Sequence, residues 1–170
     1  MNTGQSLLAI GAMILLSILI LRVNNTFLTT SSTFMDTKFE ILATSLATSQ
    51  MQEIDKLKFD QNSDTTGNYF TSTSQLTSPY SLGPETGETG PTTFNDIDDY
   101  NGYTTTINGD SALPSANFNI RCTVNYITDT NPNVVSSSAT WNKRITVYVT
   151  SVSMPDTVKL STIFSYWNFN

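Results

Sequence analysis

The stretch that decides the fold is LLAIGAMILLSILILRV, which runs from Leu7 to Val23. It carries a single charge, Arg22, and nothing comparable recurs in the rest of the chain, which is rich in Ser, Thr and Asn. A helical run of roughly 17–25 apolar residues is long enough to cross the hydrocarbon core of a bilayer. The chain therefore joins one strongly apolar end to a polar body.

Such an apolar end has three common roles: a removed secretory signal, a transmembrane anchor or a buried core helix. A secretory signal has basic residues before its apolar run and a small-residue cleavage site after it. Here MNTGQS contains no Lys or Arg, and LRVNNT offers no such cleavage pattern. A helix that is apolar all round needs cover on every side, and the polar body is too small to supply it. Lipid, or other copies of the chain, must provide this cover.

Length and charge limit the classes of function. The chain has 170 residues, which suits one compact domain with an extension. Its net charge is −6, from 14 acidic and 8 basic residues, and the bases are scattered along the sequence. Proteins that grip a phosphate backbone carry clustered basic residues. We therefore expect no nucleic-acid partner.

The chain has no histidine and a single cysteine, Cys122. This composition excludes Ser-His-Asp and Cys-His catalysis, His/Cys zinc sites and an internal disulfide. Cys122 lies in an alternating apolar pattern, so we predict that it is a small buried side chain. No other catalytic constellation is evident, and we expect a protein that is not an enzyme.

Helical periodicity follows the apolar run. Apolar side chains recur three, four or eight positions apart, on one face of a helix, at Met35, Phe39, Leu42, Leu46, Ile54 and Leu57. The pattern predicts one helix from about Gln5 to Phe59, apolar on all sides over residues 5–23 and amphipathic in its second half. Its weak point is Asn24 to Thr33, which is rich in poor helix formers. The amphipathic half has a single apolar face, which a sheet can cover.

Residues 60–102 form a predicted loop region that is rich in Gly, Pro and acidic residues. Residues 103–170 carry strand patterns separated by turns. The predicted strands are Tyr103–Ile107, Phe118–Thr128, Trp141–Val152 and Val158–Tyr166, with turns at NGD (108–110), DTNPN (129–133) and MPD (154–156). We expect an α+β fold with three regions: a long helix over 1–59, the loop region, and an antiparallel β-meander packed on the helix.

This order of elements resembles the type IV pilin superfamily, which includes type II secretion pseudopilins and minor pilins. Gly4 to Ile10 (GQSLLAI) resembles the processing stretch of that family: a Gly, then Phe, Ser or Thr, two aliphatic residues, a Glu and an aliphatic residue. The resemblance implies cleavage after Gly4, with Gln5 as the mature first residue. The acidic residue of the family then falls at Ala9. In a second alignment Met1 is the mature first residue and the acidic position falls at Gln5.

A second stretch, FNDIDDYNGY at residues 94–103, resembles a segment found in some minor pilins. The resemblance implies a structural subunit of an extracellular filament at the cell surface. Such a subunit sits in the inner membrane before assembly, interacts with the pilus or secretion machinery, and polymerises with copies of itself. The helices bundle through the residues Leu7, Leu8, Ile10, Met13, Ile14, Leu15, Leu16, Ile18, Leu19, Ile20 and Leu21, with the β bodies outside. The alternatives are a minor pilin or pseudopilin that primes such a machine, and a single-pass surface adhesin.

The same FNDIDDYNGY stretch contains a candidate metal site. Its oxygen-bearing side chains lie close together in sequence at Asp96, Asp98, Asp99 and Asn101, and oxygen ligands of this kind suit Ca²⁺. Some pseudopilins bind calcium in a comparable loop, so the resemblance also implies such a site. The other interpretation is a solvated turn in which Asp and Asn bond to the backbone. No further cofactor is expected.

Overall fold

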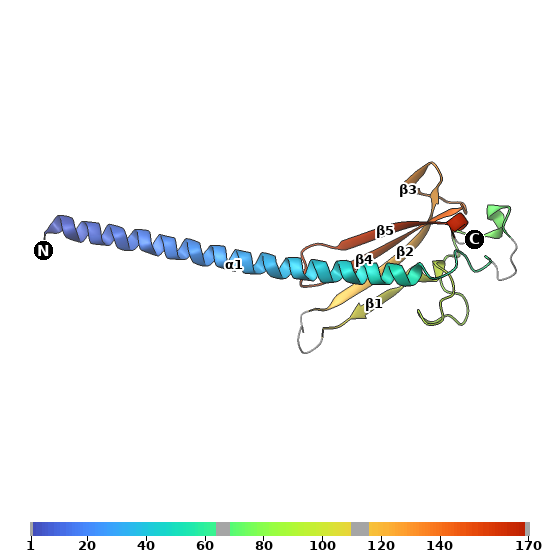
Figure 1. The fold of residues 1–170 in the computed structure, drawn as a ribbon, viewed down its shortest axis with the longest axis horizontal. Coiled ribbons are helices and arrows are strands. Elements are labelled where there is room, and N and C mark those ends of the chain that lie inside the picture. Colours follow the sequence, from blue (N-terminus) through green and yellow to red (C-terminus); the bar gives the residue numbers. More distant parts are fainter. Residues whose placement is uncertain (1, 64–68, 110–115, 169–170) are drawn as a thin grey trace. The chain divides into compact units, whose positions relative to one another are not determined.

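The computed structural model describes residues 2–63, 69–109 and 116–168 of the chain. It contains one long helix and five strands, shown in Figure 1: α1 (Thr3–Ile54), β1 (Thr104–Ile107), β2 (Phe118–Thr128), β3 (Asn131–Val135), β4 (Asn142–Thr150) and β5 (Val158–Ser165). Three short 3₁₀-helices complete the described elements: η1 (Thr73–Gln75), η2 (Asp98–Tyr100) and η3 (Tyr166–Asn168). The predicted α+β class is confirmed. The chain divides into two compact units, one ending at Phe39 and the other beginning at Glu40.

The first unit consists of the N-terminal part of α1. This part stays helical through residues 24–33, where the sequence is rich in poor helix formers. Five hydroxyl groups donate to the backbone carbonyl four residues earlier at 2.8–3.0 Å, those of Ser17, Thr26, Thr29, Thr33 and Thr37. Such back-bonding satisfies the hydroxyl inside the helix itself. Weak intrinsic propensity therefore does not interrupt the element, since propensity is only a weak prior.

In the second unit, the last part of α1 packs against the sheet through a narrow stripe. Ala43, Ala47 and Ile54 are fully buried and Met51 is 7% exposed, at spacings of four, four and three residues. The predicted face included Leu42 instead, which is half-buried beside this stripe, as is Leu46. Two alanines, whose side chains are single methyl groups, therefore lie at the centre of this buried stripe.

The helix ends five residues earlier than predicted, at Ile54 rather than Phe59. Beyond Ile54 the backbone tightens: the Lys56 amide donates to the Glu53 carbonyl at 3.3 Å and the Leu57 amide donates to the Ile54 carbonyl at 3.0 Å. Three-residue bonds of this kind are typical of a helix terminus. The chain is then free to extend at Lys58, which forms a β-bridge with Asp96.

The sheet is antiparallel, in the order β1-β2-β4-β5, with β3 paired to β2. The long central pair runs from Asn119 opposite Thr150 to Tyr126 opposite Lys143. The prediction was wrong about the segment DTNPN (129–133), which was expected to be wholly a turn. The turn occupies Asp129 and Thr130, and the chain then returns as β3. The Thr128 hydroxyl donates to the Asn131 carbonyl at 2.8 Å, which closes this hairpin.

The core of the second unit lies on one face of the sheet. Alternate residues of the two central strands are buried there: Phe118, Ile120, Cys122, Val124 and Tyr126 from β2, and Ile145, Val147 and Val149 from β4. This alternation is typical of an antiparallel sheet with one covered face. Cys122 is fully buried, as predicted, and burial raises the pKa of its thiol to about 12.

Candidate functional site

The first candidate site is the apolar segment of α1, defined as residues 7–23. All eleven side chains predicted to drive assembly are exposed, from 47% at Ile18 to 76% at Leu8. By length and composition α1 can cross a membrane, and none of its most apolar 18-residue window is buried in the described chain. Large exposed apolar patches mark surfaces that contact a partner or a membrane. Gly4 and Gln5, the predicted processing residues, lie exposed in the first turn of α1.

The second candidate site is a buried acidic cluster around η2. Backbone bonds hold this segment beside the chain that leaves α1: the Lys58 amide donates to the Asn95 carbonyl at 3.4 Å, and the Ile97 amide donates to the Lys58 carbonyl at 2.9 Å. The side chains of Asp96, Asp98 and Asp99 are fully buried there. Buried carboxylates are costly unless they are paired, so their partners define the site.

Lys143 of β4 supplies a buried positive charge to one side of this cluster. Its Nζ donates to the Phe59 carbonyl at 2.7 Å, to Asp60 Oδ2 at 3.1 Å and to Asp98 Oδ1 at 2.5 Å. The ammonium also lies 4.7 Å from the centre of the Phe59 ring. Asp60 has further partners, because both the Thr77 amide and the Tyr126 hydroxyl donate to its Oδ2. The Lys143 charge is therefore engaged by Asp60 and Asp98.

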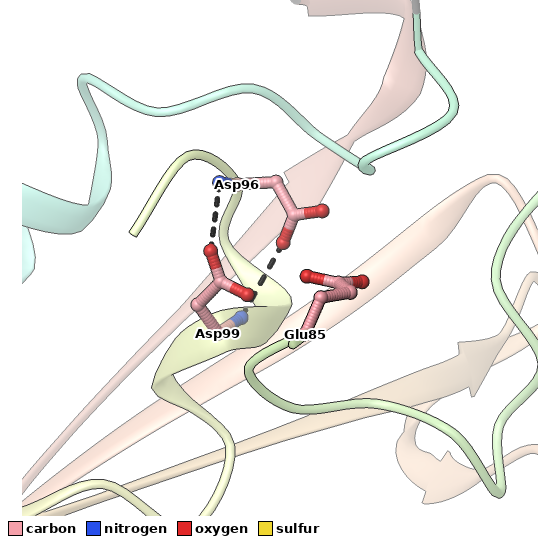
Figure 2. A group of neighbouring side chains, drawn as sticks. All are labelled: Glu85, Asp96 and Asp99. Carbon is pink, nitrogen blue, oxygen red and sulfur yellow. Dashed lines mark hydrogen bonds between the residues drawn. The ribbon is translucent and has the colours of Figure 1, made fainter. Parts of the chain in front are cut away.

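Asp96 and Asp99 form the other side of the cluster, shown in Figure 2. Asp96 Oδ1 accepts the backbone amides of Asp98 at 2.8 Å and Asp99 at 3.3 Å. Asp99 Oδ2 accepts the amides of Asn95 at 2.8 Å and Asp96 at 3.1 Å. One oxygen of each carboxylate is thus fixed by the turn. This reciprocal bonding sets the orientation of both side chains.

The remaining oxygens of this pair have no such partner. Asp96 Oδ2, Asp99 Oδ1 and Glu85 Oε2 are buried without a hydrogen-bond partner among the described residues. Figure 2 shows that Glu85 approaches from a separate loop, and one carboxylate oxygen from each of the three residues lies within 4.8 Å of the others. We call Glu85, Asp96 and Asp99 the carboxylate triad.

Electrostatics agree with this geometry. Burial, followed by the negative charge of Asp98, raises the pKa of Asp96 to about 9. Burial also raises the pKa of Glu85 to about 7, and it raises the pKa of Asp99. Each shift means that desolvation and like charges disfavour the ionised form. The three carboxyl groups of the carboxylate triad therefore resist being ionised at the same time.

The structure brings only part of the predicted metal set together. Asp96 and Asp99 lie in the carboxylate triad, whereas Asp98 faces Lys143. The Asn101 side chain is engaged elsewhere, because its Nδ2 donates to the Leu82 carbonyl and its Oδ1 accepts the Val124 amide, both at 3.1 Å. The Asn101 side chain therefore links the loop at Leu82 to β2.

Sequence reasoning missed Glu85 and Lys143. Glu85 lies in the GPETGETG loop, whose composition indicates only an acidic turn, and Lys143 is a single cation within a strand pattern. A weak local signal for Glu85 exists in its glycines. Gly83 and Gly87 both have positive φ, at 141° and 104°, which side-chain-bearing residues rarely adopt. They shape the loop on both sides of Glu85.

Comparison of the chain with known protein families, with curated proteins and with solved structures finds no match. The functional interpretation therefore depends on two features of the chain itself. These features are the exposed apolar segment of α1 and the buried carboxylate triad beside η2.

Proposed function

We propose that this chain is the structural subunit of an extracellular type IV pilus-like filament. The observation that carries the proposal is the apolar segment, whose large side chains are all exposed in the isolated chain. In this proposal the segment sits in the inner membrane before assembly, and assembly machinery transfers it into a bundle of identical helices. The β bodies form the outer surface of the filament, at the cell surface.

The energetics support a bundle that competes with lipid. Burying about ten large apolar side chains, at roughly 1.5–3 kcal/mol each relative to water, gives a gross gain on the order of tens of kcal/mol per subunit. Lipid tails are as apolar as leucine, so transfer from membrane to bundle recovers only packing contacts. Association also costs translational and rotational entropy. The bundle is therefore stable against water, while its extraction from lipid needs a machine.

Leu15→Lys tests the proposal. A lysine in a helix bundle leaves a charge without cover, so we expect this variant to form no filaments, as seen by electron microscopy of native material. Leu15→Met is the matched control, because it keeps the position apolar at similar volume. We expect the control to assemble normally. Normal filaments from Leu15→Lys would rule out a bundled apolar core.

Membrane insertion must be separated from assembly in this experiment. A central lysine costs about 2.5–3.5 kcal/mol on insertion scales, which a strongly apolar segment tolerates. We therefore expect Leu15→Lys to remain in the membrane fraction with a folded body. If the variant is found in the soluble fraction, the assembly defect has a simpler origin, and the experiment then supports a membrane anchor alone.

A second candidate function is a minor pilin or pseudopilin that primes a secretion or pilus machine. In either alignment with the processing stretch, the position that is acidic in the family holds a neutral residue here, Ala9 or Gln5. This neutral residue and the minor-pilin-like stretch at 94–103 favour the second function. Abundance distinguishes the two functions. A major subunit forms filaments made mainly of this chain, whereas a priming subunit is scarce and forms no filament of its own.

A further inference from the structure

We propose that the carboxylate triad of Glu85, Asp96 and Asp99 is a calcium-binding site. The proposal does not depend on the filament function, because the triad lies in the second unit and uses no residue of the apolar segment. Its ligands also differ from the four predicted from sequence, since Glu85 replaces Asp98 and Asn101. The proposal is supported by the charge of the triad, by its geometry and by the chemistry of its ligands.

The positive charge of Lys143 is directed at carboxylates outside the triad. Lys143 contacts Asp60 and Asp98, and neither oxygen that it contacts belongs to the carboxylate triad. Asp96 and Asp99 are fully buried, and each has one carboxylate oxygen without a hydrogen-bond partner among the described residues. Figure 2 shows the carboxyl groups of both residues beside that of Glu85. A buried carboxylate oxygen without a partner is unfavourable, and a bound cation offsets that cost. A bound cation would therefore stabilise the carboxylate triad.

The spacing of the triad oxygens suits a calcium ion. Calcium binds oxygen at 2.3–2.6 Å, so two ligands on opposite sides of one ion lie up to about 5 Å apart. One carboxylate oxygen from each triad residue lies within 4.8 Å of the others, which is close to the spacing of ligands around one calcium ion. One oxygen of Asp96 and one oxygen of Asp99 are already held by backbone amides of the turn. Two of the three ligands are thus preorganised.

Ligand chemistry selects the ion. The triad contains oxygen donors only, which suit hard cations and disfavour zinc. Calcium takes six to eight oxygens in irregular geometry, so three carboxylates leave room for bidentate contacts and water. Magnesium needs a near-ideal octahedron at 2.0–2.1 Å and keeps most of its waters. A carboxylate-lined buried site therefore favours calcium over magnesium.

Calcium would fasten the Glu85 loop to η2. Glu85 comes from a loop between η1 and η2 that contributes few apolar side chains to the core, whereas Asp96 and Asp99 belong to a hydrogen-bonded turn beside the chain that leaves α1. An ion shared by both segments replaces mutual repulsion by attraction. Loop residues 76–95 should therefore become more protected from proteolysis and hydrogen exchange when calcium binds.

The test uses the full chain in detergent micelles, stripped of metal with EDTA and titrated with calcium by calorimetry. We expect one calcium ion per chain, and a higher thermal unfolding midpoint in calcium than in EDTA or magnesium. No heat and no shift of the midpoint at millimolar calcium, from a cooperatively folded chain, would overturn the proposal. That result would leave the filament proposal untouched, since assembly is measured separately.

Glu85→Gln supplies the sharper comparison, because its side chain is only half-buried and the substitution preserves shape. We expect calcium affinity to fall at least tenfold. In EDTA the variant should unfold at the same temperature as the parent chain or at a higher one, because one repelling charge is gone. In calcium the variant should unfold at a lower temperature than the parent chain. Glu53→Gln on the exposed side of α1 is the matched control and should change neither quantity. Unchanged calcium affinity in Glu85→Gln would refute the site.

Discussion

At the scale of single residues, Lys143 is a buried cation held by several partners at once. Its ammonium lies within hydrogen-bond distance of two carboxylates and one carbonyl, and its side chain has no solvent exposure. Taking charges out of water is expensive, and their mutual attraction repays the cost only when geometry is good. Removing one partner of such a group is therefore far more damaging than replacing the whole group.

We predict that Lys143→Met destabilises the protein by about 3–5 kcal/mol, because it leaves Asp98 buried without a cation. Asp60 keeps the Thr77 amide and the Tyr126 hydroxyl, so the loss is concentrated at Asp98. Denaturant unfolding of the full chain in detergent measures this loss. Adding Asp98→Asn to Lys143→Met should recover part of it.

The control for this prediction is Lys159→Met in β5, an exposed lysine over the Tyr148 ring. Exposed cation–π contacts contribute about 0.5–1 kcal/mol, so the change should be small. A loss below 1 kcal/mol in Lys143→Met would contradict this prediction, and would mean that the buried carboxyl groups take up protons when the lysine is absent.

The sequence of the acidic cluster predicts part of its site and misses the rest for a physical reason. Asp96 and Asp99 are three residues apart, so a single turn brings them together, and local spacing is enough to find them. Glu85 and Lys143 reach the same region through a loop and a strand. Their positions depend on the loop glycines and on the strand register, which no local pattern encodes.

At the scale of elements, small residues form the centre of the buried stripe of α1. Ala43 and Ala47 are both fully buried, so water does not reach their methyl groups. A period of 3.6 residues predicts the correct side of the helix. It does not identify small residues as the centre of that side, because large apolar side chains dominate the pattern and alanine, the strongest helix former, fits any face of a helix.

We predict that Ala47→Leu destabilises the second unit by about 1–3 kcal/mol, since the larger side chain overpacks a filled contact. Thr48→Leu, one position further along α1, is the matched control, because Thr48 is exposed. It should change the free energy of unfolding by less than about 0.5 kcal/mol. Equal effects of the two substitutions, measured by thermal unfolding, would mean that this face of α1 is not tightly packed.

Sequence patterns predict some strands of the sheet closely and miss another. Alternation predicts β2 and β5 to within a residue, because each presents one covered face and one open face. β3 escapes detection because Asn131 and Pro132 read as turn residues, and its side chains are all exposed. Its strand geometry comes from hydrogen bonds to the end of β2 and not from a buried face.

At the scale of the whole molecule, the two compact units differ in what covers them. The second unit contains the buried side chains of the sheet and the acidic cluster, whereas the apolar segment in the first unit is exposed throughout. The cost of exposing apolar surface in water is therefore concentrated at one end of the sequence. Folding and association can be altered separately by substitutions in different units.

We predict that a fragment of residues 30–170 folds cooperatively without detergent. It lacks the apolar segment, and none of the large side chains removed with that segment is buried. Circular dichroism should show the same strand signal as the full chain, and light scattering should show a monomer. The full chain without detergent is the comparison, and it should form large particles. A fragment that fails to unfold cooperatively would contradict the independence of the second unit.

The self-satisfied hydroxyls of α1 have a mechanical consequence for the proposed filament. Ser17, Thr26 and Thr29 donate to their own helix, so they demand no bond from a neighbouring helix. Side-chain hydrogen bonds between helices normally lock one register. A bundle built on back-bonded hydroxyls and aliphatic groups would instead slip under tension, exchanging one set of dispersion contacts for another. Such a filament would lengthen under load and shorten again without breaking a polar link.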